Sequence, residues 1–79
     1  MLWISDAHTR SYTGSWKEGV MEGYGEMMYT DGSVYTGWWH KGMRYGHGRM
    51  EYKEPEAVYI GGWERNGREG YGVYHESVE

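Results

Sequence analysis

One aromatic motif occurs three times in this chain, at steps of 23 and 24 residues. The motif is Tyr-x-Gly-x-Trp, and it begins at Tyr12, Tyr35 and Tyr59. A Gly-x-Gly pair follows each motif, and its first glycine stands seven residues after the tryptophan in all three cases. A period this short allows one small supersecondary unit per repeat, and such units stack to bury a shared core. We therefore expect an array of three similar units.

Each unit predicts a β-hairpin. The motif residues alternate, which places their side chains on one face of a first strand. The Gly-x-Gly pair continues this alternation on a second strand, where Met27 and Tyr29 follow in the first unit. Gly19 and Gly42 mark the turns, and Asn66 takes that place in the third unit, since Asn is the usual non-glycine residue at positive φ. Fourteen glycines also exclude a helical bundle, because each interior glycine costs a helix about 1 kcal/mol.

The connections between the units are expected to differ in length. Asp31-Gly32 is a two-residue turn signal, whereas the second connection runs from Lys53 to Ala57. Pro55 in this second connection has no backbone N–H and is expected in a loop rather than in a paired strand.

The repeats divide the chain into four segments. We assign residues 1–11 to an N-terminal lead-in, with half a repeat as one interpretation, and residues 12–34, 35–58 and 59–79 to three repeats. Neither end shows a recognisable cap, and bare terminal strands expose unpaired backbone groups. We therefore expect part of a longer array, or an end that is covered by a partner or by self-association through an edge strand.

The aromatic residues predict a core of rings resting on bare backbone, a surface that we call the ring face. A ring can lie flat on a strand only where the neighbour has no side chain, and the tryptophan rings are expected to lie over glycines of the paired strand. Besides Met27 and Met50, the ring face comprises Tyr12, Trp16, Tyr29, Tyr35, Trp39, Tyr52, Tyr59, Trp63 and Tyr74. The structural glycines are Gly14, Gly23, Gly25, Gly37, Gly46, Gly48, Gly61, Gly70 and Gly72. Burial of each large apolar side chain contributes about 1.5–3 kcal/mol, so these residues could hold a single sheet.

The combined pattern Tyr-x-Gly-x-Trp-x-x-Gly-x-x-x-Gly-x-Gly resembles the MORN repeat, the membrane occupation and recognition nexus, over about residues 12–74. Three units match in phase, which makes the resemblance specific. It implies an all-β fold, a curved single-layer antiparallel sheet of successive β-hairpins. It also implies a non-catalytic module that binds proteins or, by an older proposal, phospholipids.

The ring face is the candidate binding surface, because one layer cannot cover its own apolar face. These rings either only build the sheet or also dock a helical or extended segment of a partner protein on a concave aromatic face. Charged residues of alternating sign at the rim would tune specificity and association rate more than affinity, namely Glu18, Glu22, Lys41, Arg44, Arg65, Arg68 and Glu69. Trp38 faces the opposite way, and two interpretations stay open: packing across strands against Tyr24, Met28 or Val73, or contact with a partner or a second copy.

Charge and composition limit the other functions. The net charge of −4 argues against nucleic acid and disfavours anionic membranes, although a phospholipid-binding module remains an alternative, as does a targeting or regulatory module of a larger enzyme. We expect no catalytic residues, cofactor or metal site, since His8, His40, His47 and His75 have no cysteine partners and no catalytic constellation is recognisable. The lack of cysteine agrees with a reducing compartment, and we expect a cytoplasmic, including a cytoskeleton-associated, location.

Overall fold

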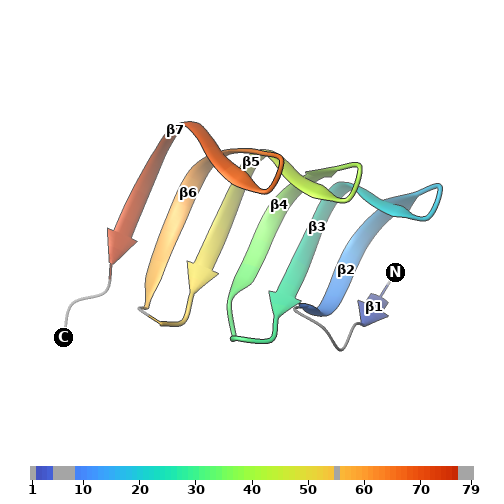
Figure 1. The fold of residues 1–79 in the computed structure, drawn as a ribbon, viewed down its shortest axis with the longest axis horizontal. Helices are drawn as coiled ribbons and strands as arrows, with labels where there is room; N and C mark the ends of the chain where they lie inside the picture. The colour runs from blue at the N-terminus through green and yellow to red at the C-terminus, as the bar shows by residue number, and fades with distance from the viewer. Residues whose placement is uncertain (1, 5–8, 55, 77–79) are drawn as a thin grey trace.

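Seven antiparallel strands form one sheet in the computed structural model, which describes residues 2–4, 9–54 and 56–76. The strands lie side by side in chain order from one end of the molecule to the other (Figure 1). Their bounds are β1 Leu2–Ile4, β2 Thr9–Lys17, β3 Val20–Tyr29, β4 Val34–His40, β5 Met43–Tyr52, β6 Ala57–Glu64 and β7 Gly67–Glu76. The curved single-layer sheet of hairpins is thus confirmed. Two residues with a sequence prediction, His8 and Pro55, lie outside the described residues.

All three hairpins close with the same two-residue turn. Glu18-Gly19, Lys41-Gly42 and Arg65-Asn66 join the paired strands, and both residues of each turn have positive φ. This is the type I′ geometry, whose twist matches that of the flanking strands. Asn66, at φ 69°, occupies the position that glycine holds in the first two turns, as the sequence predicted.

The connections between the units correct the sequence prediction. Both are four residues long, residues 30–33 and 53–56, so the second is not longer and Asp31-Gly32 is not a two-residue turn. In the first connection, Gly32 N–H donates to Tyr29 O at 3.0 Å and Ser33 N–H donates to Asp31 Oδ1 at 2.8 Å. The Asp31 side chain thus stabilises a four-residue connection, which the Asp31-Gly32 pattern alone does not predict.

A bulge in each hairpin explains the spacing of the Gly-x-Gly pair. On β4, Gly37 and Trp39 are two residues apart, whereas their partners on β5 are four residues apart. Trp38 therefore opposes three residues, and the central one, Gly46, has φ 74°. The first glycines of the other two pairs have φ 96° and 73° at the same point. The first glycine of each pair thus provides a backbone conformation that other residues rarely adopt.

The second glycine of each pair leaves space for a ring. A Cβ on Gly25 would overlap the Tyr12 phenol, and a Cβ on Gly48 would overlap that of Tyr35. The third unit repeats this contact. The rings that lie on the glycines are therefore those of the motif tyrosines, which corrects the expectation for the tryptophans Trp16, Trp39 and Trp63.

The tryptophans stand on edge and join neighbouring units. Trp39 lies between Tyr12 and Tyr35, with ring centroids 5.5 and 5.1 Å away and nearly perpendicular planes. Its Nε1–H donates to Gly25 O of the preceding unit at 3.2 Å, and Trp63 makes the equivalent bond to the second unit at 3.4 Å. Edge-to-face pairs of this kind contribute about 0.5–1.5 kcal/mol each beyond burial. Each of these two indoles thus links its own hairpin to the one before it.

The buried core follows the predicted ring face with three differences. The buried members are Tyr12, Met27, Tyr35, Trp39, Met50, Tyr59 and Trp63, with Trp16, Tyr29 and Tyr52 half-buried around them. Tyr74 was expected there but is 46% exposed, because β7 is the edge strand of the described sheet. Met21 and Ala57 contribute to the apolar interior without having been predicted.

Candidate partner-binding site

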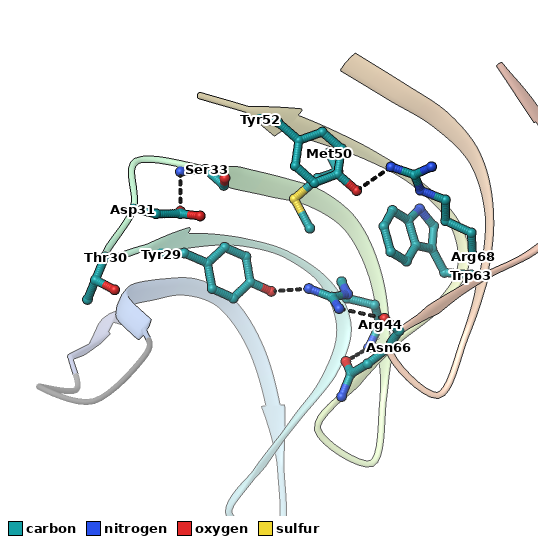
Figure 2. A pocket seen from close by; sticks show the side chains of 10 residues that line it. All are labelled: Tyr29, Thr30, Asp31, Ser33, Arg44, Met50, Tyr52, Trp63, Asn66 and Arg68. Carbon is teal, nitrogen blue, oxygen red and sulfur yellow. Dashed lines mark hydrogen bonds between the residues drawn. The ribbon is translucent and has the colours of Figure 1, made fainter. Parts of the chain in front are cut away.

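A cleft of about 570 Å³ opens on the ring face, inside the curve of the strands (Figure 2). It crosses all three units, because its walls come from the end of β3, from β5, and from the β6–β7 hairpin. The lining residues are Tyr29, Thr30, Asp31, Ser33, Arg44, Met50, Tyr52, Trp63, Asn66 and Arg68.

Most of the predicted binding residues form the base beneath this surface rather than its rim. Five of the nine are at most 5% exposed, namely Tyr12, Tyr35, Trp39, Tyr59 and Trp63. Only Tyr29, Tyr52 and Trp63 line the cleft. Trp16 borders a separate small hollow beside the first turn, and Tyr74 lies on the edge strand. The rings therefore already cover one another, and a ligand in the cleft would meet mainly the half-buried tyrosines and two arginines.

Arg44, which belongs to the second unit, contacts residues of the first and third units as well. Its Cζ lies 4.9 Å from the Trp63 ring centroid and 5.7 Å from that of Tyr29. Its Nη1 donates to Tyr29 Oη at 2.7 Å, while Nη2 donates to Asn66 O. The Arg44 backbone N–H donates to Asn66 Oδ1 at 2.9 Å. This guanidinium is stacked and hydrogen-bonded, which is more than the rim charge that the sequence predicted.

Arg68 repeats this arrangement one unit later. Its Cζ lies 4.7, 5.3 and 5.0 Å from the ring centroids of Tyr59, Tyr52 and Tyr74, and its Nη2 donates to Tyr52 Oη at 2.8 Å. Both arginines stand five residues after a motif tryptophan, directly across the hairpin from it. That shared position is the sequence signal that could have identified the pair.

Burial of the tyrosines sets a limit on alkaline stability. Burial raises the pKa of Tyr35 from 10.0 to about 12, and the nearby Arg44 charge partly opposes the rise. A folded-state pKa above the unfolded one gives stability that is complete below pH 10 and lost as the pH rises towards 12. We expect the urea midpoint to fall over this interval.

The control for this prediction is Tyr35→Phe, measured by circular dichroism between pH 8 and pH 12.5. Its midpoint should start lower, because the bond to Trp38 O is lost, but should fall less steeply with pH. Some decline remains, since burial also raises the pKa values of Tyr12 and Tyr29. A decline as steep as that of the unmodified protein would contradict the assignment to Tyr35.

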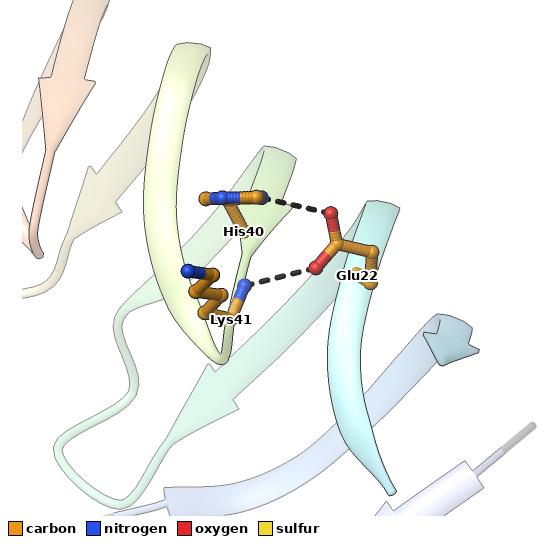
Figure 3. Close-up of polar contacts among 3 residues, drawn as sticks. All are labelled: Glu22, His40 and Lys41. Carbon is orange, nitrogen blue, oxygen red and sulfur yellow. Dashed lines mark hydrogen bonds and ion pairs between the residues drawn. The ribbon is translucent and has the colours of Figure 1, made fainter. Parts of the chain in front are cut away.

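A second contact between units lies at the turn end of the sheet (Figure 3). Glu22 Oε1 accepts the Lys41 backbone N–H at 2.9 Å, and Glu22 Oε2 lies 2.9 Å from His40 Nδ1. The bond from Lys41 N–H, followed by the contact with His40, lowers the pKa of the Glu22 carboxyl. The contact joins the first hairpin to the turn of the second, and it is exposed to solvent.

The opposite face carries exposed apolar side chains. Trp38 is 50% exposed and packs edge-on against Tyr24 at 5.3 Å between ring centroids. The packing interpretation of Trp38 therefore agrees with the structure, and a contact with a partner stays a prediction. Further exposed apolar residues on this face include Met28, Ile60, Tyr71 and Val73.

Within residues 2–4, 9–54 and 56–76, no three His, Cys, Asp or Glu side chains come together as metal ligands would. Within the same ranges, no helix has the length and apolar character needed to span a bilayer.

The family model of the MORN repeat matches this chain at residues 12–34 and 59–75, which together make up about half of it. The chain therefore belongs to the MORN repeat family. The middle unit lies outside the two matches, yet its hairpin has the same turn, bulge and tyrosine-on-glycine contact as the others. No curated protein matches the chain in a sequence search. Membership of this family indicates a repeat module that binds proteins or membranes.

Proposed function

We propose that this chain is a non-catalytic scaffold that docks an extended or helical segment of a partner protein on its concave ring face. The observation that carries the proposal is the cleft, which presents Tyr29, Tyr52, Trp63, Arg44 and Arg68 together. Tyr, Trp and Arg are the residues most enriched among binding hot spots. A cytoplasmic setting, including the cytoskeleton, suits a chain without cysteine.

Preorganisation favours this surface over the opposite face. The two arginines are held by hydrogen bonds to Tyr29, Asn66 and Tyr52, so their side chains are ordered before a partner arrives. Ordering a flexible side chain on binding costs about 0.5–1.5 kcal/mol, which a preformed site avoids. A segment lying along the cleft would contact three units at once.

The test compares two single tyrosine truncations. A displayed library of random peptides is selected against the unmodified protein, and the bound clones are then measured against Tyr52→Ala and Tyr71→Ala. Tyr52 lines the cleft, whereas Tyr71 is 91% exposed on the opposite face, which makes it a matched control. We expect Tyr52→Ala to weaken binding about tenfold and Tyr71→Ala to leave it unchanged.

Two results would overturn the proposal. Clones that lose affinity with Tyr71→Ala but not with Tyr52→Ala would place docking on the opposite face. A library without binders, combined with salt-sensitive flotation on anionic liposomes, would identify a membrane module instead, despite the net charge of −4. Circular dichroism of both variants verifies that the sheet is intact.

A further inference from the structure

The cleft has the opposite charge to the rest of the protein. The chain carries a net charge of −4, but the cleft is lined by two arginines and a single acid, Asp31. One oxygen of Asp31 already accepts Ser33 N–H at 2.8 Å. Among the described residues neither Arg44 nor Arg68 forms an ion pair, whereas Arg49 on the opposite face pairs with Glu51 at 2.6 Å. Neither guanidinium group of the cleft is thus paired with a carboxylate of the described residues.

Both guanidinium groups keep donors for a ligand. An arginine side chain has five N–H donors. Arg68 uses one terminal nitrogen for Tyr52, and Arg44 uses one N–H of each terminal nitrogen, for Tyr29 and Asn66. One N–H on each terminal nitrogen of Arg44 remains, and a carboxylate can accept from such charged donors. The stacked rings fix the planes of both groups.

From this arrangement we infer that the partner segment is acidic and that Arg44 and Arg68 receive two of its carboxylates. The inference rests on the proposed function and names the chemistry of the partner. Arg44 is half-buried against aromatic rings, which lower the local dielectric, so a carboxylate gains more there than at an exposed arginine.

The spacing of the two arginines sets the spacing of the acids. Arg44 lies on β5 and Arg68 on β7, with β6 and its Trp63 between them. Neighbouring strands are about 4.8 Å apart, so the two backbones are roughly 10 Å apart. Arg68 opposes Trp63, which in turn opposes Gly46, so Arg44 is also displaced from Arg68 by two residues along the strands. In an extended segment, residues four positions apart have their side chains on the same face and span about 13 Å. The segment that fits therefore has two acidic residues four positions apart, with an apolar residue midway between them that meets the Trp63 indole.

The probe is a capped peptide in which two glutamates stand four positions apart with a leucine midway between them, compared with a twin in which both glutamates are glutamines. Binding to the 79-residue chain is followed by NMR chemical shifts at low salt. We expect the glutamate peptide to bind at least about tenfold more tightly than its twin, since hydrogen bonds to charged groups are stronger than those to neutral amides. Arg68→Gln should remove this difference, and Arg68→Lys should retain part of it.

Arg49→Gln is the matched control, because it removes the same charge from the opposite face. It should leave the preference for glutamate unchanged, and Arg44→Gln serves as a second test if its spectrum shows a folded sheet. Equal binding of the two peptides overturns the inference, as does an equal loss in Arg49→Gln and Arg68→Gln. Anionic vesicles that bind through Arg68 and resist competition by the glutamate peptide would also overturn it, in favour of a lipid phosphate.

Failure of this inference is distinguishable from failure of the proposed function. If selected library clones depend on Tyr52 but bind Arg68→Gln normally, the proposed docking surface is supported and the inference of an acidic partner segment is wrong. If no clone depends on Tyr52, the docking surface itself is wrong.

Discussion

Replacing Trp39 by alanine is expected to leave most of the molecules unfolded, whereas the same change at the adjacent Trp38 is expected to leave them folded. Trp39 is 4% exposed, packs against Tyr12 and Tyr35, and bonds to the preceding unit, while Trp38 is 50% exposed. Loss of a buried tryptophan costs about 3–5 kcal/mol. That is most of the free energy of unfolding of a domain this small. Urea denaturation followed by circular dichroism measures the difference.

The pair is a strict comparison, because both variants lose the same side chain from neighbouring positions. Trp39→Phe keeps a ring but removes the indole N–H, so its midpoint should lie between those of Trp39→Ala and the unmodified protein. Equal destabilisation by Trp38→Ala and Trp39→Ala would show that the two faces of the sheet contribute alike. The ring layer would then not be the core.

A second large effect is expected when a single methyl group is added at Gly48. Its Cβ would overlap the phenol of Tyr35, a ring that is fully buried with Trp39 and Trp63 on either side at 5.1 and 5.3 Å. Because the ring has no room to retreat, Gly48→Ala should lower the free energy of unfolding by about 3 kcal/mol. The measurement is the same urea titration, analysed with one common m-value, the dependence of the free energy of unfolding on urea concentration.

The control substitution is Gly67→Ala. A Cβ there would meet its nearest neighbour, Glu64 O, at 3.6 Å, which is an ordinary contact, and Gly67 does not have a positive φ. We expect its stability to stay within about 0.5 kcal/mol of the unmodified protein. A Gly48→Ala variant as stable as Gly67→Ala would show that the tyrosine ring does not rest on the glycine backbone.

The fold was largely predictable from the sequence, because each of the three copies of the motif independently predicts the same β-hairpin. Alternation placed Tyr12, Gly14 and Trp16 on one strand, and the type I′ requirement explained Asn66. Alternation alone could not separate the two glycines of a pair, since one is needed for its positive φ and the other for the space under a ring. The length of the first connection depends on the Asp31 side chain, which no periodic pattern contains.

The candidate site was predicted less well than the fold. The sequence identified the rings but not that curvature and mutual packing bury five of them, so the accessible part of the ring face is smaller than expected. Arg44 and Arg68 were assigned to a charged rim because their stacking on rings depends on side-chain directions across strands. Their common place, five residues after a tryptophan, becomes informative once the strand register is known.

The bonds from the Trp39 and Trp63 indoles to the preceding hairpins hold successive units at a regular spacing. Every unit adds two strands, or roughly 10 Å of length. At both junctions between hairpins the same tryptophan-to-glycine bond and the same arginine-to-tyrosine bond are made again. A copy of the middle unit spliced into the array would meet matching neighbours on both sides. The length of the array can therefore change by whole units while the contacts between neighbouring units stay the same.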